Sequence, residues 1–380
     1  MPETSIQKLS EYGQSAWLDS ISRSMIESGK LNEMIVRGVL GITSNPSIFN
    51  AAISKSEDYD KKIIELKEAG KTTFEIYDEL TVKDIADAAD AFLGIYESTN
   101  KKDGYVSLEI NPQLSDKVDE SIKEGKRLFE KVGRPNLMIK VPATKEGYPV
   151  IEELISCGIN VNATLIFSLQ HYIDTAKAYI KGLTRLAETQ DDLSGVHSVA
   201  SVFVSRTDSA IDKILDEKIN AEADDDIKSR MKSLQGKAAV SNCALVFNKF
   251  EEIFDSNDFK ALLDKKANIQ RVLWASTSTK SAEYSDIKYV TELISKPTVN
   301  TLPEKTFMAF LDHGEVGGDK FTLKEDAENV IKNLKAFDID INSICANLLA
   351  AGVLSFEEAF ESLFSAIKQK SEQLSLKELS

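Results

Sequence analysis

The chain has 380 residues, of which 42% are hydrophobic and 28% are charged, a composition typical of a folded globular protein and not of a disordered one. Its 61 acidic and 46 basic residues give a net charge of −15, which disfavours binding to nucleic acid or anionic membranes through a broad basic face. An anionic ligand would therefore have to be held by a few local cations.

Targeting and membrane segments are not indicated by the sequence. The N-terminal segment 1–17 lacks a basic start and an apolar core, and no run approaches the roughly 18 apolar residues of a membrane span. We therefore expect a cytoplasmic protein. The cysteines are odd in number and far apart, which supports neither a disulfide framework nor a zinc ribbon: Cys157, Cys243 and Cys345.

Motifs for metals and nucleotide cofactors are also missing. The three histidines are isolated, and the acidic cluster 311–315 is expected to be a loop beside glycines and not a set of metal ligands. Residues 314–320 match neither the phosphate-loop nor the dinucleotide glycine spacing. We therefore expect neither a metal nor a nucleotide cofactor.

Eight short β-rich runs alternate along the chain with longer helical patterns. The predicted strands are 15–20, 39–44, 105–110, 136–141, 159–167, 197–204, 269–276 and 297–303. Helical patterns between them include 46–70, 117–133 and 168–188. Strict alternation predicts parallel strands joined by crossover helices, and eight such strands predict a closed (β/α)8 barrel of the TIM type, in the α/β class.

The chain is longer than the about 250 residues of a typical barrel of this kind, so the excess should lie in insertions. We expect these insertions in the helical region 71–100, in the acidic segment 212–237 and in extra C-terminal helices after residue 320. No internal repeat or flexible linker divides the sequence. It is therefore predicted to form a single decorated barrel domain over residues 1–380.

Lys140 is a charged residue inside an apolar strand, 136–141. Alternation places its side chain on the same face as Met138 and opposite Ile139. Burial disfavours the charged form of an amine, and a neutral amine can form a Schiff base with a carbonyl compound. The alternative is that Lys140 reaches past the strand end to solvent or pairs with a structural carboxylate.

Other polar residues are predicted at the carboxyl ends of the strands, where barrel enzymes have their active sites. They are Asp19, Asn45, Glu109, Asn160, Asn162 and Thr164. Each has a structural alternative. Asn45 can cap a helix that begins at Pro46, and either carboxylate can pair with a structural cation. Asn162 and Thr164 can hydrogen-bond to each other.

Several motifs together resemble the transaldolase family, particularly its longer bacterial form. GITSNPSIF (41–49) is similar to the family's first signature, and LMIKVPAT (137–144) is similar to the segment that bears its Schiff-base lysine. The segments 158–168, 198–209 and 271–280 also resemble family motifs and occur in the family's order. The resemblance covers roughly residues 15 to 315.

This resemblance implies a class I mechanism that needs no cofactor. Lys140 would form a Schiff base with the ketone of a ketose phosphate. Asp19 would remove and return the proton of the hydroxyl at the bond being broken. Glu109, with Thr164 and a water molecule, would shuttle protons during imine formation.

The resemblance also implies the residues that hold the three-carbon part of the sugar. Asn45, Asn162 and Ser201 match the residues that bind the dihydroxyacetone unit. Phe203 shares a face with Ser201 and is expected to look into the site, where an apolar ring would protect the reactive intermediate from protonation.

Two further matches imply the binding site of the substrate phosphate. Arg206 and Ser276 correspond to phosphate-binding positions, which would supply the local charge that an acidic chain needs. Ser278 stands where relatives often have glycine or arginine, so the second cation is expected to be Lys280. Arg206 can take this role only if the chain leaves the strand before residue 206.

The predicted activity is that of a transaldolase of the pentose phosphate pathway. It would transfer dihydroxyacetone from sedoheptulose 7-phosphate to glyceraldehyde 3-phosphate, giving erythrose 4-phosphate and fructose 6-phosphate. Alternatives are an aldolase on the same scaffold, a phosphate-binding barrel without catalysis, and a metal-dependent sugar-phosphate enzyme. The predicted partners are small sugar phosphates, without nucleic acid or membrane; whether the chain forms a homo-oligomer is left open.

Overall fold

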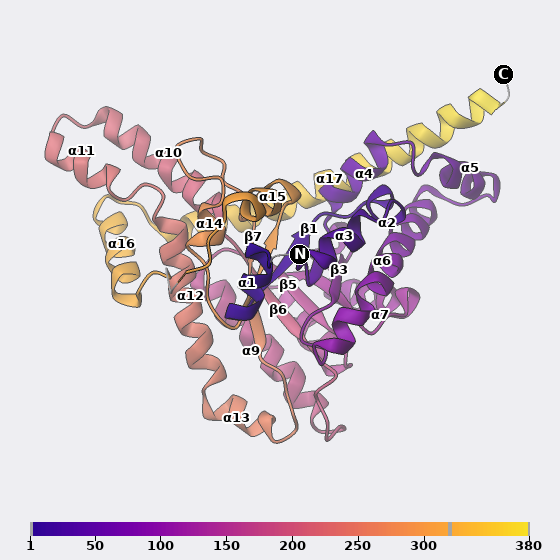
Figure 1. The fold of residues 1–380 in the computed structure, drawn as a ribbon, viewed down its shortest axis with the longest axis horizontal. Helices are drawn as coiled ribbons and strands as arrows, with labels where there is room; N and C mark the ends of the chain where they lie inside the picture. Colours follow the sequence, from indigo (N-terminus) through magenta and orange to yellow (C-terminus); the bar gives the residue numbers. More distant parts are fainter. Residues whose placement is uncertain (1–2, 318–320, 379–380) are drawn as a thin grey trace.

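The computed structural model describes residues 3–317 and 321–378, and its centre is a closed barrel of eight parallel strands in the order β1 to β8 (Figure 1). The strands are β1 (Gln14–Asp19), β2 (Gly41–Thr43), β3 (Tyr105–Glu109), β4 (Leu137–Pro142), β5 (Val161–Ile166), β6 (Ser198–Phe203), β7 (Gln270–Ala275) and β8 (Thr298–Leu302). Parallel pairing of β1 with β8 closes the ring. The prediction of a (β/α)8 barrel is therefore confirmed.

Helices surround the barrel and extend beyond it (Figure 1). They are α1 (Ser5–Tyr12), α2 (Arg23–Glu27), α3 (Lys30–Val36), α4 (Pro46–Lys55), α5 (Asp60–Glu68), α6 (Thr73–Ser98), the 3-10 helix η1 (Pro112–Leu114), α7 (Val118–Val132), α8 (Gly147–Ser156), α9 (Leu169–Leu186), α10 (Ser205–Ala221), α11 (Asp225–Lys232), α12 (Ala238–Phe254), α13 (Asn257–Leu263), α14 (Lys288–Thr291), α15 (Glu304–His313), α16 (Lys324–Ala336) and α17 (Ile341–Glu378).

Alternation along the strands separates two sets of buried side chains. Trp17, Tyr105 and Met138 belong to one apolar cluster, with the rings of Trp17 and Tyr105 6.2 Å apart. Their neighbours Leu18 and Ile139 belong to the other cluster, which joins the strands to the helices. This is the arrangement of a filled barrel, in which every second strand residue points inward. Lys140 follows the inward parity of Met138, as the sequence pattern predicts.

The connection between β2 and β3 differs from the prediction. Residues 46–70 form two helices, α4 and α5, because Ser56 is extended and Tyr59 turns into the core, where its hydroxyl donates to Asp84 at 2.8 Å. The region 71–100 is not an insertion. Its helix α6 packs on β3 and α7 as the crossover helix, whereas α4 and α5 are the additional elements and pack on α17.

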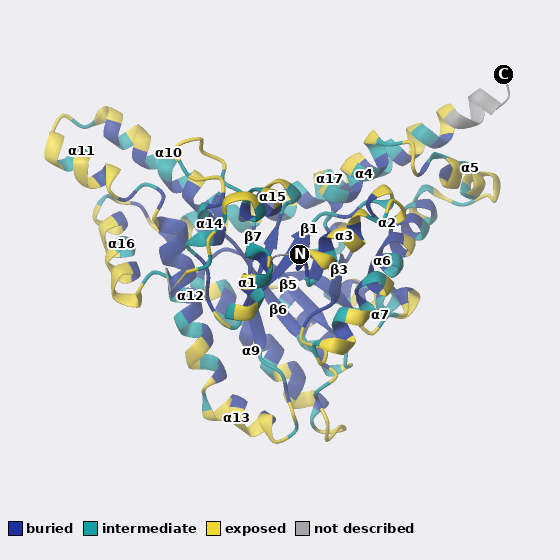
Figure 2. Ribbon diagram, viewed as in Figure 1, coloured by how far each residue is buried: buried dark blue, intermediate teal, exposed yellow. Residues whose placement is uncertain are grey.

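The long helix α17 lies across the carboxyl face of the barrel and reaches α4, α5, α6 and α10 as well as β5 (Figure 1). One side of it is buried, through residues that include Phe356, Phe360 and Leu363, and the other side is exposed (Figure 2). Within the described residues, the stretch Ile341–Gln373 is long and apolar enough to cross a membrane by length and composition alone. Phe360 and Phe364 of this stretch instead pack on Tyr77 of α6. We propose, on these contacts, that the whole chain is one domain.

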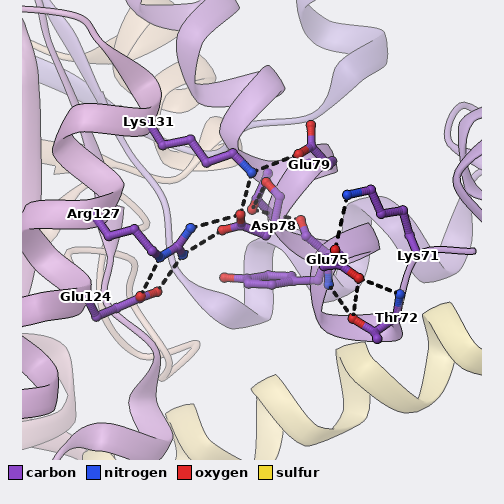
Figure 3. A network of polar contacts seen from close by, with 10 residues as sticks. Lys71, Thr72, Glu75, Asp78, Glu79, Glu124, Arg127 and Lys131 are labelled. Atoms are coloured by element: carbon purple, nitrogen blue, oxygen red, sulfur yellow. Dashed lines mark hydrogen bonds and ion pairs between the residues drawn. The ribbon is translucent and has the colours of Figure 1, made fainter.

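An ion-pair network fastens α6 to α7 (Figure 3). The carboxylate of Asp78 accepts hydrogen bonds from Arg127 at 2.7 and 3.0 Å and from Lys131 at 2.6 Å. Burial alone would raise the pKa of Asp78, but these two cations outweigh it and the pKa is lowered. The stability that this shift contributes is present above the unfolded-state pKa and is lost as the pH falls through the folded-state pKa.

We expect Asp78→Ala to lower the free energy of unfolding by about 2 kcal/mol at neutral pH, because it leaves two cations without their shared carboxylate. The matched control is Glu79→Ala, since Glu79 pairs with the same Lys131 but its side chain is far more exposed than that of Asp78, so it should contribute less than about 0.5 kcal/mol. Urea unfolding of both variants measures the difference, which should shrink as the pH is lowered. Equal effects of the two substitutions would contradict this account.

Candidate active site

A cavity of about 210 Å³ opens at the carboxyl ends of the strands. It is lined by nine of the eleven predicted site residues: Asp19, Asn45, Lys140, Thr164, Ser201, Phe203, Arg206, Ser276 and Lys280. The other two, Glu109 and Asn162, are buried directly beside it and contact residues that line it. The residues predicted from the sequence therefore lie together at one site in the folded chain.

Lys140 is 4% exposed and lies near the end of β4. Its Nζ atom donates to the backbone carbonyl of Ser44 at 2.9 Å and lies 3.4 Å from Oε2 of Glu109. The side chain of Lys140 therefore does not reach past the strand end to solvent, which was one alternative from the sequence. It does pair with a carboxylate, which was the other. That pair borders a cavity, which gives the amine access to a ligand.

Burial has a large effect on the two carboxylates of the site. Desolvation raises the pKa of Glu109 to about 7, against the opposing attraction of Lys140. Desolvation also raises the pKa of Asp19, opposed by Lys140 and by the hydrogen bond from Thr43 Oγ1 at 2.7 Å. A carboxyl group with a pKa near 7, as for Glu109, can both donate and accept protons at neutral pH, which is the property that general acid–base catalysis requires.

A hydrogen-bond chain fixes the amide of Asn162 between neighbouring strands. Its Nδ2 donates to Ser107 Oγ at 3.0 Å, and its Oδ1 accepts from Ser201 Oγ at 2.6 Å. Asn162 and Thr164 therefore do not satisfy each other. Thr164 Oγ1 is instead buried at the cavity without a hydrogen-bond partner among the described residues, as is Glu109 Oε2 apart from its contact with Lys140. Buried unpaired polar atoms at a cavity are suited to a polar ligand.

Asn45 combines a structural role with a place in the cavity. It is the N-cap of α4: Oδ1 accepts from the backbone N–H of Ile48 at 3.0 Å, and Pro46 occupies the first turn. The predicted capping role is present. Because the cap occupies only the oxygen, the amide nitrogen is left for a ligand in the cavity that Asn45 also lines.

The cations of the cavity lie at the ends of β6 and β7. Strand β6 ends at Phe203, and Val204 has helical backbone angles, so the chain leaves the strand before Arg206, as the phosphate-binding role requires. Arg206 is half-buried and stacks on Phe203 at 5.4 Å, and no acidic partner is found for it among residues 3–317 and 321–378. Burial lowers the pKa of Arg206, a cost that a bound anion would offset.

The loop after β7 supplies the remaining polar groups. Ser276 has a left-handed backbone (φ 55°), which redirects the chain at the strand end, and its hydroxyl lies 3.1 Å from that of Ser205. Lys280 is exposed and donates to Ser278 Oγ at 2.9 Å, and both side chains line the cavity. Ser278 and Lys280 therefore belong to the same part of the site.

Sequence reasoning missed some residues that line the cavity: Thr43, Ser47, Thr301, Pro303 and Phe356. Thr43 could have been found, because it lies inside the first motif (41–49) at the end of a strand, where its inward parity is readable. Phe356 gave no such signal, since it lies on α17, far along the chain from every motif.

The acidic segment 311–315 is not the expected loop throughout, because α15 continues to His313. His313 pairs with Asp286 at 3.0 Å and with Asp312 at 3.2 Å on the surface. No group of three or more His, Cys, Asp or Glu side chains suited to a metal ion occurs in the part of the chain that the structure describes. Residues 318–320 of the glycine-containing segment 314–320 lie outside it.

A buried lysine paired with a carboxylate at the carboxyl end of a (β/α)8 barrel is an arrangement suited to an enzyme that acts on carbonyl compounds through a lysine Schiff base. The family model described as transaldolase/fructose-6-phosphate aldolase matches residues 16–367, and the chain belongs to this family.

Relatives named transaldolase align over nearly the whole chain. The transaldolase of Trichodesmium erythraeum is 44% identical over 370 residues, covering 97% of each chain. Transaldolase 2 of a Nostoc species is 42% identical over 372 residues, covering 97% of this chain and 98% of the relative. The transaldolase of Saccharopolyspora erythraea is 41% identical over 372 residues with the same coverage.

Proposed function

We propose that the chain is a transaldolase that transfers a dihydroxyacetone unit from sedoheptulose 7-phosphate to glyceraldehyde 3-phosphate. The observation that carries this proposal is the buried pair of Lys140 and Glu109 beside Asp19, at a cavity that Arg206 also lines, with no acidic partner for Arg206 among the residues that the structure describes. Amine, proton carriers and phosphate-binding cation are the groups that a Schiff-base enzyme for sugar phosphates needs. Three free thiols among the described residues support a cytoplasmic location as part of the proposal.

The first chemical step joins the substrate to Lys140. The amine, after passing a proton to Glu109, attacks the ketone carbon of the donor, and the resulting carbinolamine loses water to give a protonated imine. Glu109, 3.4 Å from the amine, is the proposed carrier of the protons that are removed and supplied in this step. Thr164, whose buried hydroxyl has no hydrogen-bond partner within residues 3–317 and 321–378, is the proposed residue that orients the water.

The second step breaks a carbon–carbon bond. Asp19 takes the proton of the hydroxyl next to the bond being broken, the aldehyde leaves, and the electron pair enters the imine to form an enamine. Asn45, Asn162 and Ser201 are proposed to hold the hydroxyl groups of the three-carbon unit. The enamine carbon then attacks the carbonyl carbon of the acceptor aldehyde, and Asp19 returns the proton to the new hydroxyl group. Water hydrolyses the resulting imine by the reverse of the first step, which releases the new ketose phosphate and restores the amine of Lys140.

The direct test uses fructose 6-phosphate as donor and erythrose 4-phosphate as acceptor, in the presence of a chelator. The proposal expects rapid release of glyceraldehyde 3-phosphate that depends on the acceptor and is unaffected by chelation. Donor consumption that is equally fast without acceptor would make the chain an aldolase, and a strict metal requirement would contradict the mechanism.

Arg206→Ala is expected to weaken the use of phosphorylated donors much more than the use of unphosphorylated donors of the dihydroxyacetone unit. The guanidinium is half-buried and has no acidic partner in the described part of the chain, so its loss removes a charge-assisted contact with the substrate phosphate of about 1.5–3 kcal/mol, or roughly ten- to hundredfold in kcat/KM. Steady-state kinetics on both donor types measures this. Lys280→Ala is the exposed comparison and should lose less; equal losses on both donor types would place the phosphate elsewhere.

A further inference from the structure

The side chain of Phe356 covers the proposed Schiff-base lysine from outside the barrel. It is 5% exposed, and the centre of its ring lies 5.8 Å from Lys140 Nζ. The same ring lines the main cavity and also a small neighbouring cavity that borders Glu109 and Leu165. Phe356 therefore forms the wall between the reacting amine and a second opening next to its proton carrier.

Helix α17 is held in this place by contacts near Phe356. One turn earlier is Gly352, where a Cβ atom would lie 3.0 Å from a methyl carbon of Leu165, so the glycine lets the helix approach β5 closely. One residue later, Glu357 accepts a hydrogen bond at 2.9 Å from Ser115, which follows η1. These contacts on both sides of the ring fix Phe356 over the cavity.

The chemistry of the proposed function makes such a cover important. After the first aldehyde leaves, a three-carbon enamine remains on Lys140 and waits for the acceptor. If the enamine carbon takes a proton from water, a second water can add to the resulting imine. The bond between carbon and Nζ then breaks, giving free dihydroxyacetone and the original amine. An apolar ring supplies no proton and keeps water out of the space that it fills.

We propose that Phe356 is a specificity-determining residue that retains the three-carbon unit on Lys140 until a sugar-phosphate acceptor arrives. This inference rests on the proposed transaldolase activity. Phe203 bounds the same cavity from the end of β6, where its ring packs 5.3 Å from that of Phe167. The barrel therefore supplies one aromatic wall, and the C-terminal helix supplies the other.

The test compares two rates in Phe356→Ala and Phe356→Leu with those of the unmodified protein. One is the release of dihydroxyacetone from fructose 6-phosphate alone, and the other is transfer to erythrose 4-phosphate. The ratio of release to transfer should rise roughly tenfold in Phe356→Ala, as expected if about 1.4 kcal/mol of protection is lost. Phe356→Leu keeps an apolar side chain of similar reach and should give a smaller rise.

The matched control is Phe360→Ala, one turn further along the same helix. Phe360 is buried to the same degree and packs on Tyr77 at 5.1 Å, but it lines neither cavity. Phe360→Ala should therefore leave the ratio of release to transfer unchanged. An equal rise in Phe360→Ala would mean that the effect comes from altered packing of α17 on the barrel, and it would overturn the role of the Phe356 ring.

An unchanged ratio in a Phe356 variant that still transfers would also overturn the proposal. If Phe356→Ala does not fold, the Leu variant decides on the same criterion. Failure of the proposed function is recognised separately, because the unmodified protein would then show no acceptor-dependent transfer at all.

Discussion

In Lys140→Met, transfer is expected to fall by a factor on the order of 10⁴ or more, because removing the nucleophile removes the covalent route itself. Methionine fills a similar volume in the inward-facing position, so the barrel should still fold. Reduction with borohydride in the presence of fructose 6-phosphate should add a dihydroxyacetone-derived mass to the peptide that contains Lys140 in the unmodified protein. The variant should acquire none.

The matched control is Lys145→Met, because Lys145 lies in the same region of the chain but is exposed to solvent. It should keep both the transfer rate and the adduct. An adduct found on Lys145 or Lys280 in the unmodified protein would refute the assignment of Lys140, as would a Lys140→Met protein that still transfers.

Substitution of Glu109 and of Asp19 should block different steps of the reaction, and each should lower the rate of transfer roughly 10²- to 10⁴-fold. Glu109→Ala removes the carboxylate 3.4 Å from the amine and should slow the formation of the imine. Asp19→Ala leaves the pair of Lys140 and Glu109 intact, so the imine should form but the carbon–carbon bond should not break.

Borohydride trapping at a series of times separates these outcomes by mass. Glu109→Ala should give little adduct at early times. Asp19→Ala should give an adduct that retains the whole six-carbon donor. Folding of each variant is checked by its urea unfolding transition, and identical trapping in the two variants would contradict this division of roles.

The barrel and most of the site were predictable because both depend on local patterns that repeat along the chain. Each strand alternates, so the inward parity of Lys140 and Thr164 could be read without coordinates. The position of Arg206 could not be derived this way, since it depends on the turn that Val204 makes after β6. The resemblance to the family supplied it instead.

The errors in the sequence-based predictions have a common physical cause. The split of 46–70 into two helices depends on Tyr59 reaching Asp84, a tertiary contact that a helical period does not encode. The extension of α15 to His313 and the crossover role of α6 likewise depend on what each helix packs against. Phe356 is the extreme case, because only the docking of α17 brings its ring to Lys140.

The path of the chain also has a consequence for the synthesis of the enzyme on the ribosome. Strand β1 is made first but has a neighbour on both sides only when β8 emerges, and the cover over Lys140 comes later still, with α17. During translation the apolar edges of an open barrel are therefore exposed for most of the chain's length, a condition that favours aggregation of nascent proteins. Retention of the three-carbon unit should therefore appear only after α17 has emerged, so a product truncated before α17 should lack it even when all of its catalytic residues are present.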